Sequence, residues 1–304
     1  MSFMKQINLE KIIRIFLFFC AISASLILLF IILFLINEAM PFLSSGDLLG
    51  FVSGTKWIPK SDIYQAGIFI AGSLLTTLGA VIIAVPFGLA CAIFLSEVAP
   101  KKARDIMRPA IELLAGIPSV VYGLFALIVI IGFIQFDLGN ALTGSPLPTG
   151  KGILAASLIL AVMILPIIIS ISQDALQSVP RSYREGSYAM GSTRWQTIKG
   201  VVVPAALPGI MAGVILAVGR AIGETMAVVL VLGNVGIIPT NLIGTASRGE
   251  SLTSAIMLEM GYASVGSIHY SALFALGLLL FTIAFGLSLA SEYLMSKKRR
   301  QQKC

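Results

Sequence analysis

Chemically versatile side chains are scarce in this sequence of 304 residues, which has one histidine, three cysteines and only 12% charged residues. A zinc site of the His-Glu-x-x-His type needs two histidines on one helix, so a single histidine, His269, excludes it. Cys20 and Cys91 lie inside apolar runs and Cys304 is the last residue, so no disulfide framework is expected. We therefore predict neither a metal site nor a catalytic site.

The sequence also lacks a phosphate-binding loop, the Gly-rich stretch ending in Gly-Lys-Ser/Thr through which many proteins bind ATP. The nearest match is Gly150-Lys151-Gly152, which has no hydroxyl residue at its end and has Ser145 in place of the earlier glycine. We predict that this chain is not an enzyme and binds neither ATP nor another cofactor by itself.

Long apolar runs dominate what is present, with 57% hydrophobic residues and a mean hydropathy of +0.97. A helix needs about 20 apolar residues to span the hydrocarbon core of a membrane. Six segments reach this length: Ile15–Ile36, Ala66–Leu95, Leu113–Gln135, Gly152–Gln173, Ala205–Gly233 and Tyr270–Ser291. The first is too long for a signal peptide, so we expect it to be retained. The sequence predicts an all-α integral membrane protein with six transmembrane helices.

Positive charges gather on one side of the predicted membrane. Sixteen Lys and Arg residues lie in the stretches 1–14, 96–112, 174–204 and 296–304, against four in 37–65, 136–151 and 234–269. Positively charged loops stay in the cytoplasm, so we predict that both termini are cytoplasmic. The net charge of +7 is thereby explained by membrane orientation, and no nucleic-acid partner is expected.

The predicted cytoplasmic loop 174–204 contains unusually clear local signals. Pro180 suits a helix start, Gly191 suits a left-handed helix stop, and Thr193 with Gln196 forms a capping box for a second helix. We expect two short helices bent at Gly191 directly before the fifth span. The aromatic residues of this elbow suit a docking surface, although a solvated loop is the simpler alternative: Tyr183, Tyr188 and Trp195.

The fifth run contains two charged residues, Arg220 and Glu224, whose presence within a membrane is costly. Four positions apart on a continuous helix, they would share one face, but such a pair alone gains only about 0.2–0.5 kcal/mol. They could bond to polar groups of neighbouring helices and fix packing, or they could line a transport route. Gly209, Gly213, Gly219 and Gly223 are expected to form close-packing seams on the same helix.

The elbow resembles the Glu-Ala-Ala…Gly…Ile-x-Leu-Pro loop of ABC importer permeases, through Glu185, Gly191 and Val201-x-Val203-Pro204. Gly186 and Ser187 replace the two alanines of that pattern. Other stretches are similar to phosphate-specific permeases: Val85–Gly88, Phe94–Glu97, Glu112–Gly123 and Gly219–Val228. The Glu-Thr-Met-Ala-Val ending, with Trp57-Ile58-Pro59 in the first outer loop, resembles the C-type subunit of that family, and the likeness covers roughly residues 50–295.

This resemblance implies the permease fold of type I ABC importers, in the bacterial cytoplasmic membrane. Its expected divisions are a first helix and periplasmic loop (1–65), a five-helix core with the coupling loop (66–295) and a basic tail (296–304). The implied function is half of a phosphate route coupled to a separate ATPase, which binds ATP and magnesium. The implied partners are an A-type permease subunit, two ATPase subunits, a periplasmic phosphate-binding protein and membrane lipid.

The resemblance also suggests roles for particular residues. Arg220 and Glu224 would lie on the phosphate route, and the elbow would contact the ATPase through Glu185, Gly191, Tyr183, Tyr188, Trp195 and Pro204. An ion-coupled anion transporter using Glu224 as a proton site is the main alternative, and a scaffold protein without a route is the second. The first alternative does not explain the elbow, and a passive scaffold has no reason to keep the two costly charges. Trp57 is expected at a membrane interface, and Ser251–Met260 is expected to form a short amphipathic helix.

Overall fold

The computed structural model describes residues 2–44 and 47–301, in which helices, one short hairpin and an isolated bridge between Gly233 and Gly249 are joined by loops. The main helices are α1 (Ser2–Leu43), α3 (Gly67–Ile93), α4 (Lys101–Ala115), α5 (Ser119–Phe125), α7 (Ile153–Gln177), α8 (Arg181–Ala189), α10 (Val203–Ile222) and α13 (Ile268–Gln301). The shorter elements are α2 (Leu48–Ser53), β1 (Trp57–Ile58), β2 (Ile63–Tyr64), α6 (Gly139–Thr143), α9 (Arg194–Thr197), α11 (Met226–Val231) and α12 (Leu252–Glu259).

Within the described residues, six helical stretches are long and apolar enough to cross a membrane: Ile13–Leu43, Gly67–Val98, Ser119–Thr143, Ile153–Gln177, Arg194–Ile222 and Ile268–Leu289. Several of them continue through π-helical turns, such as Phe94–Val98 after α3 and Ile198–Val202 between α9 and α10. Four of the six predicted spans are confirmed to within a few residues or lie inside a longer helix. The third and the fifth differ from prediction.

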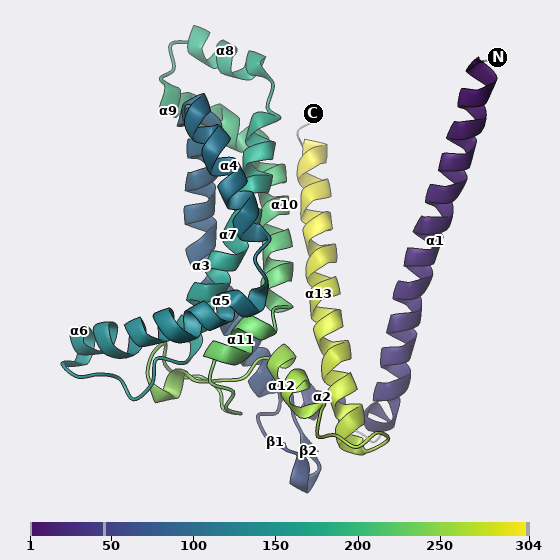
Figure 1. Cartoon of the computed structure of the whole chain (residues 1–304), viewed down its shortest axis with the longest axis vertical. Helices are drawn as coiled ribbons and strands as arrows, with labels where there is room; N and C mark the ends of the chain where they lie inside the picture. Colours follow the sequence, from purple (N-terminus) through teal and green to yellow (C-terminus); the bar gives the residue numbers. More distant parts are fainter. Residues whose placement is uncertain (1, 45–46, 302–304) are drawn as a thin grey trace.

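The third span does not begin at Leu113, because the chain bends at Gly116-Ile117-Pro118. Proline cannot donate the next helical hydrogen bond and disfavours a helical residue before it. Leu113 therefore belongs to α4, a helix that replaces most of the predicted 96–112 loop. The apolar helix after the bend, α5 to α6, crosses the ends of α3 and α7 instead of running beside them (Figure 1).

The fifth span does not continue to Gly233. Helix α10 ends at Ile222, Gly223 caps it, and Glu224 lies in the break before α11. The expectation that Arg220 and Glu224 share one face of a continuous helix is therefore wrong. Arg220 occupies the last turn of α10, where a cation is favoured by the helix dipole.

Helix α7 is the centre of the core, with 67% of its most apolar stretch buried, and it packs along α3 and α10. Small residues let these backbones approach: a Cβ atom at Gly209 would lie 2.5 Å from the Cβ atom of Ala175. The predicted seam is confirmed at Gly209 and Gly213. At Gly219 and Gly223 an added Cβ atom would meet no other helix within the described residues, so a seam there stays a prediction.

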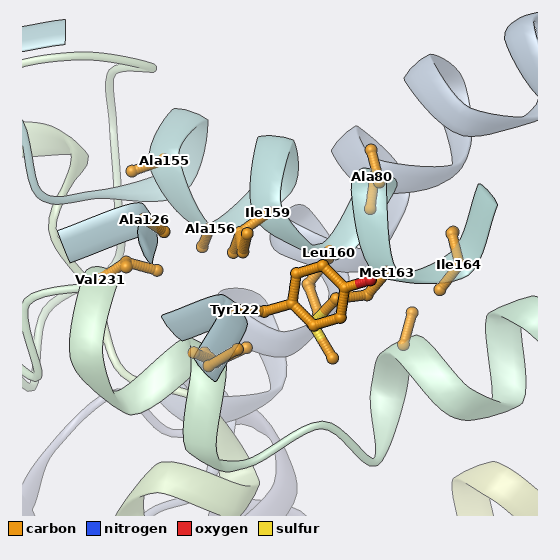
Figure 2. Packing of buried hydrophobic residues seen from close by; sticks show 14 of the residues in the cluster. Ala80, Tyr122, Ala126, Ala155, Ala156, Ile159, Leu160, Met163, Ile164 and Val231 are labelled. Atoms are coloured by element: carbon orange, nitrogen blue, oxygen red, sulfur yellow. The ribbon is translucent and has the colours of Figure 1, made fainter. Parts of the chain in front are cut away.

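The Tyr122 ring of α5 closes this core from one side. It lies beside Ile159, Leu160 and Met163 of α7, in a cluster that also includes Val231 of α11 (Figure 2). The side chains around it are mostly small or aliphatic, so the ring fills a space that no other aromatic side chain of this buried cluster enters. Helices α5 and α11, each following a break in the chain, are thereby fixed to α7.

Two ends of the bundle can be distinguished in Figure 1. We call the end with α8 and α9 the elbow end, and the end with β1, β2 and α2 the hairpin end. The start of α1 and the last turns of α13 lie at the elbow end (Figure 1). Helix α1 stands apart from the core along its first half and meets α13 towards the hairpin end, where the rings of Phe34 and Phe274 are 5.7 Å apart.

Candidate functional site

The predicted elbow is present and has the expected geometry. Helix α8 starts after Pro180, and Gly191 has a φ of +82°, which is the left-handed conformation that favours glycine. Thr193 and Gln196 form the capping box that starts α9. The second helix is longer than expected, because α9 runs through a π-helical turn directly into α10. The elbow is therefore joined without interruption to a membrane-spanning helix.

The exposed surface of the elbow is apolar at its tip. Tyr183 and Tyr188 on α8 are exposed, as is Met190, which is 87% exposed and was not singled out from the sequence. Glu185 is also exposed and makes no hydrogen bond within the described chain. A solvent-exposed methionine beside two tyrosines is typical of a surface that another protein covers.

Trp195 and Pro204 lie away from this tip. Trp195 lines an apolar groove of about 400 Å³ against α3, together with Phe94 and Val98. Pro204 lies in the first turn of α10 and is exposed. The structure therefore separates the residues assigned to the elbow into a tip formed by α8 and a second group near the ends of α3 and α10.

A half-buried ion pair fastens α8 to the bundle. The Arg184 guanidinium donates to both carboxylate oxygens of Glu97, at 2.7 and 3.2 Å. It also donates to the carbonyl oxygens of Leu176 and Val179, at 2.9 and 2.7 Å. Sequence analysis did not single out Arg184, because its partners are far from it along the chain.

The break between α10 and α11 exposes the two charged residues of the fifth span. Arg220 is exposed and Glu224 is half-buried, and among the described residues neither side chain forms a hydrogen bond or an ion pair. The packing alternative, in which they bond to polar groups of neighbouring helices, therefore has no support within this chain. The Glu224 backbone is fixed, because its carbonyl oxygen accepts from the Thr253 hydroxyl of α12 at 3.0 Å.

The bend before α5 lies close to this break. Tyr122 donates from its hydroxyl to the carbonyl oxygen of Leu114 at 2.7 Å, across the Gly116–Pro118 bend. Arg220 is near enough to Tyr122 to act on it electrostatically. A Cβ atom at Gly123 would lie 3.0 Å from the Ala227 Cα atom, so glycine permits the contact between α5 and α11. Two interrupted helices and an unpaired guanidinium thus meet in one region.

Helix α12 confirms the expected element at Ser251–Met260, with Ser251 as its N-cap. Its buried side carries Thr253 and Ser254 as well as Leu252, so it is less amphipathic than expected. The backbone amide of Leu252 donates to the Ser73 hydroxyl at 2.9 Å. Glu250, directly before this helix, is only 9% exposed. Burial raises the pKa of Glu250 to about 7, and the Glu259 carboxylate acts in the same direction.

The hairpin end is held by a second carboxylate that sequence analysis missed. The Trp57 indole donates to both oxygens of Glu259, at 2.8 and 2.9 Å, and His269 lies 2.7 Å from the same carboxylate. The Trp57 ring packs edge-on against Tyr64 and Phe69, with centroids 5.1 Å away in each case. Trp57 is therefore half-buried in the protein, and its place at a membrane interface stays a prediction.

Comparison with known proteins identifies the kind of chain that carries these features. Residues 84–300 match the family described as "Binding-protein-dependent transport system inner membrane component". A probable ABC transporter permease of Bacillus subtilis, YqgH, is 42% identical over 88% of this chain and 81% of its own length. The phosphate transport system permease PstC of Mesorhizobium japonicum is 39% identical, over 81% of this chain and 78% of its own length.

Solved structures show the same fold at low sequence identity. A chain of an alginate ABC importer, 17% identical, matches with a TM-score of 0.54 over 91% of this chain and 95% of its own length. A chain of the MetNI methionine transporter, 18% identical, matches with a TM-score of 0.53 over 76% of this chain and 93% of its own. The predicted permease fold of ABC importers is thereby confirmed.

Proposed function

This chain belongs to the binding-protein-dependent transport system inner membrane components, and we propose that it is the C-type permease subunit of an ATP-driven phosphate importer. It is a multi-pass inner-membrane protein and a transport component, not an enzyme. The observation that carries the choice of substrate is the similarity, over about four fifths of the chain, to permeases named for phosphate transport, such as the Haemophilus influenzae PstC at 38% identity.

The family implies a binding protein and an ATPase as partners in general terms. We propose the fuller assembly of an A-type permease subunit, two ATPase subunits that bind ATP and magnesium, and a periplasmic phosphate-binding protein. Purification of this chain from native membranes should recover an ATPase and a second permease of similar size. Uptake of radioactive phosphate into vesicles should stop when ATP is withheld. Uptake driven by a proton gradient without ATP would instead support the ion-coupled alternative.

We propose that Arg220 and Glu224 lie on the phosphate route, at the break between α10 and α11. The absence of an ion pair for either side chain in the described chain supports this, because an unpaired guanidinium is free to contact an anion. Thr253 supports the same interpretation, since its bond to the Glu224 carbonyl holds the break in place while leaving the carboxylate free.

Substitution of Arg220 tests this route. Arg220→Gln should abolish phosphate uptake while the complex still assembles, because the side chain keeps its polarity and most of its length. Arg220→Lys should restore part of the uptake, since a point charge replaces a planar fork. Normal uptake by Arg220→Gln would remove the residue from the route. Failure of that variant to assemble with its partners would favour a packing role.

We propose that the elbow docks against an ATPase subunit through Tyr183, Tyr188, Glu185 and the turn at Gly191. Exposed apolar side chains around Met190 support this. Trp195 and Pro204 remain part of the proposed coupling region, although they lie nearer α3 and the start of α10. Crosslinks from a cysteine placed at Met190 to the ATPase subunit would support the proposal, and crosslinks only to lipid would contradict it.

Orientation is the remaining element of the proposal, with the elbow end and both termini in the cytoplasm. The sixteen-to-four distribution of Lys and Arg supports it, as does the position of the elbow at the same end as the start of α1. A cytoplasm-active reporter fused after Cys304 should be active, and one inserted near Gly244 should be silent. The reverse pattern would overturn both the orientation and the docking of the elbow.

A further inference from the structure

Arg184 occupies a position in α8 that differs from those of its neighbours. Tyr183 and Glu185 on either side are exposed, whereas the Arg184 side chain is 18% exposed and the Glu97 side chain 10%. The guanidinium points into the bundle, away from the tip that we propose contacts the ATPase. Its four hydrogen bonds use all three of its nitrogens.

The acceptors of Arg184 belong to the ends of two different helices. Leu176 lies in the last turn of α7, and Val179 lies two residues beyond the end of that helix. The last carbonyl oxygens of a helix have no regular i→i+4 partner, and the Leu176 oxygen accepts a long bond from the Val179 amide, at 3.4 Å, besides the bond from Arg184. Glu97 lies in the π-helical turn that ends the α3 span. A carboxylate at a helix C-terminus is unfavourable by itself, because the helix dipole is negative there. A largely desolvated carboxylate in this position is stabilised by a cation, and Arg184 supplies it.

Further contacts strengthen this junction. Arg194, at the start of α9, donates to the carbonyl oxygen of Glu97. The Ser187 and Thr197 hydroxyls lie 2.9 Å apart and join α8 to α9. The elbow is thus attached to the membrane helices in three ways. They are the continuous helix from α9 into α10, the bond of Arg194 to the Glu97 backbone, and the contact of Arg184 with the ends of the α3 span and α7.

We infer that Arg184, with Glu97 as its partner, is a positioning residue that transmits movement of the elbow to the ends of α3 and α7. This inference rests on the proposed function, in which the elbow moves with the ATPase. Without the ion pair and the other bonds of Arg184, a shift of α8 would reach α10 through α9, and would reach the α3 span only through the Arg194 bond to the Glu97 backbone. It would have no direct side-chain bond to α7 within the described residues. With the ion pair intact, the same shift reaches three packed helices together, because α7 packs on both α3 and α10.

The ratio of phosphate transported to ATP hydrolysed, measured with the complete transporter in liposomes, tests this inference. Arg184→Gln should lower the ratio about 10-fold, a typical coupling between sites, while the amount of co-purified ATPase stays the same. Glu97→Gln should lower it as well. Arg184→Lys should be intermediate, because an ammonium group cannot serve two carbonyls and a carboxylate in one plane.

Two matched variants serve as controls. Arg181→Gln removes an exposed arginine from the same helix, and Glu112→Gln removes the acid of an exposed pair with Arg108. Both should transport and hydrolyse as the unmodified protein does. Hydrogen exchange of the α8 amides should become faster in Arg184→Gln and stay unchanged in Arg181→Gln.

Three results would overturn the inference. The first is an unchanged transport-to-hydrolysis ratio in Arg184→Gln. The second is that Arg184→Lys and Glu97→Gln lose co-purified ATPase subunit in the same proportion as they lose phosphate uptake, which would show a merely structural role. The third is unchanged exchange of α8 in Arg184→Gln, a measurement that does not depend on transport. Failure of the proposed function is recognised separately, because the unmodified complex would then move no phosphate.

Discussion

Glu250 should make the stability of this protein depend on pH. The residue is buried before α12, and its backbone packs closely on α3, because a Cβ atom at Gly72 would lie only 2.1 Å from the Glu250 carbonyl oxygen. No cation faces its carboxylate in the described chain; Glu259 is the charged group that acts on it. The neutral form is therefore favoured in the folded state, and the pKa rises from the ordinary 4.5 to about 7.

The sign and size of the effect follow from this difference. Between pH 4.5 and about 7 the unfolded chain loses the Glu250 proton first, so the folded state holds more protons and its stability falls as pH rises. The stabilisation of the folded state that comes from the protonated Glu250 carboxyl group is fully present below pH 4.5 and fully lost above about pH 7. The difference between the two pKa values corresponds to a change of about 3 kcal/mol in the free energy of unfolding.

Glu250→Gln isolates this contribution, because glutamine has nearly the same shape and no charge. The variant should have a higher melting temperature than the unmodified protein at pH 8 and the same one at pH 4.5, when both are measured in detergent. Glu112→Gln, at an exposed position, is the matched control and should change neither value. Equal melting temperatures of Glu250→Gln and the unmodified protein at pH 8 would refute the argument that burial raises the pKa of this carboxyl group.

Three further predictions concern backbone and packing. Gly191→Val should insert into the membrane but lose phosphate uptake, since a left-handed φ costs about 1–2 kcal/mol for a residue with a Cβ atom. Gly191→Asn should retain uptake, and equal uptake by both variants would contradict the docking role. Gly209→Ala should lower stability by about 1–3 kcal/mol through contact with α7, and Gly219→Ala should not, as thermal unfolding can show. Glu259→Ala should cost about 1–3 kcal/mol by leaving the Trp57 indole without an acceptor, and an unchanged melting temperature would contradict this.

Local signals explain why much of the fold could be predicted. The long apolar runs predicted the spans because length and composition alone determine whether a helix can cross a membrane. Gly191 and the Thr193 capping box predicted the elbow because each acts within a single turn of the chain. Nothing beyond the neighbouring residues is needed for either feature.

The breaks in the third and fifth spans could not be found in the same way. Apolar residues continue on both sides of Gly116–Pro118 and of Gly223–Thr225, so averaging hydropathy over a window reports one run where the backbone makes two helices. The glycine and proline at the first break, and the glycine at the second, were signals for an interruption. Membrane helices often tolerate such residues without breaking, and for this reason the signals were not decisive.

Contacts between distant residues are the other limit. Arg184 and Glu97 are 87 positions apart, and Trp57 and Glu259 are 202 apart. The sequence around each of these residues does not indicate its partner, and only the packing of the helices brings the partners together. The groups that fasten both ends of the bundle were therefore not visible in the sequence.

The π-helical turn at Ile198–Val202 has a consequence for how the elbow faces. A turn with i→i+5 bonds holds about one residue more than an α-helical turn, so it takes up that residue without rotating the helix on either side. Deleting Gly200 should therefore close the turn and leave the elbow pointing as before. Deleting Ala212, in the regular part of α10, should swing it by about 100° around the helix axis. The orientation of α9 relative to α10 around the helix axis is therefore insensitive to the loss of one residue within this turn.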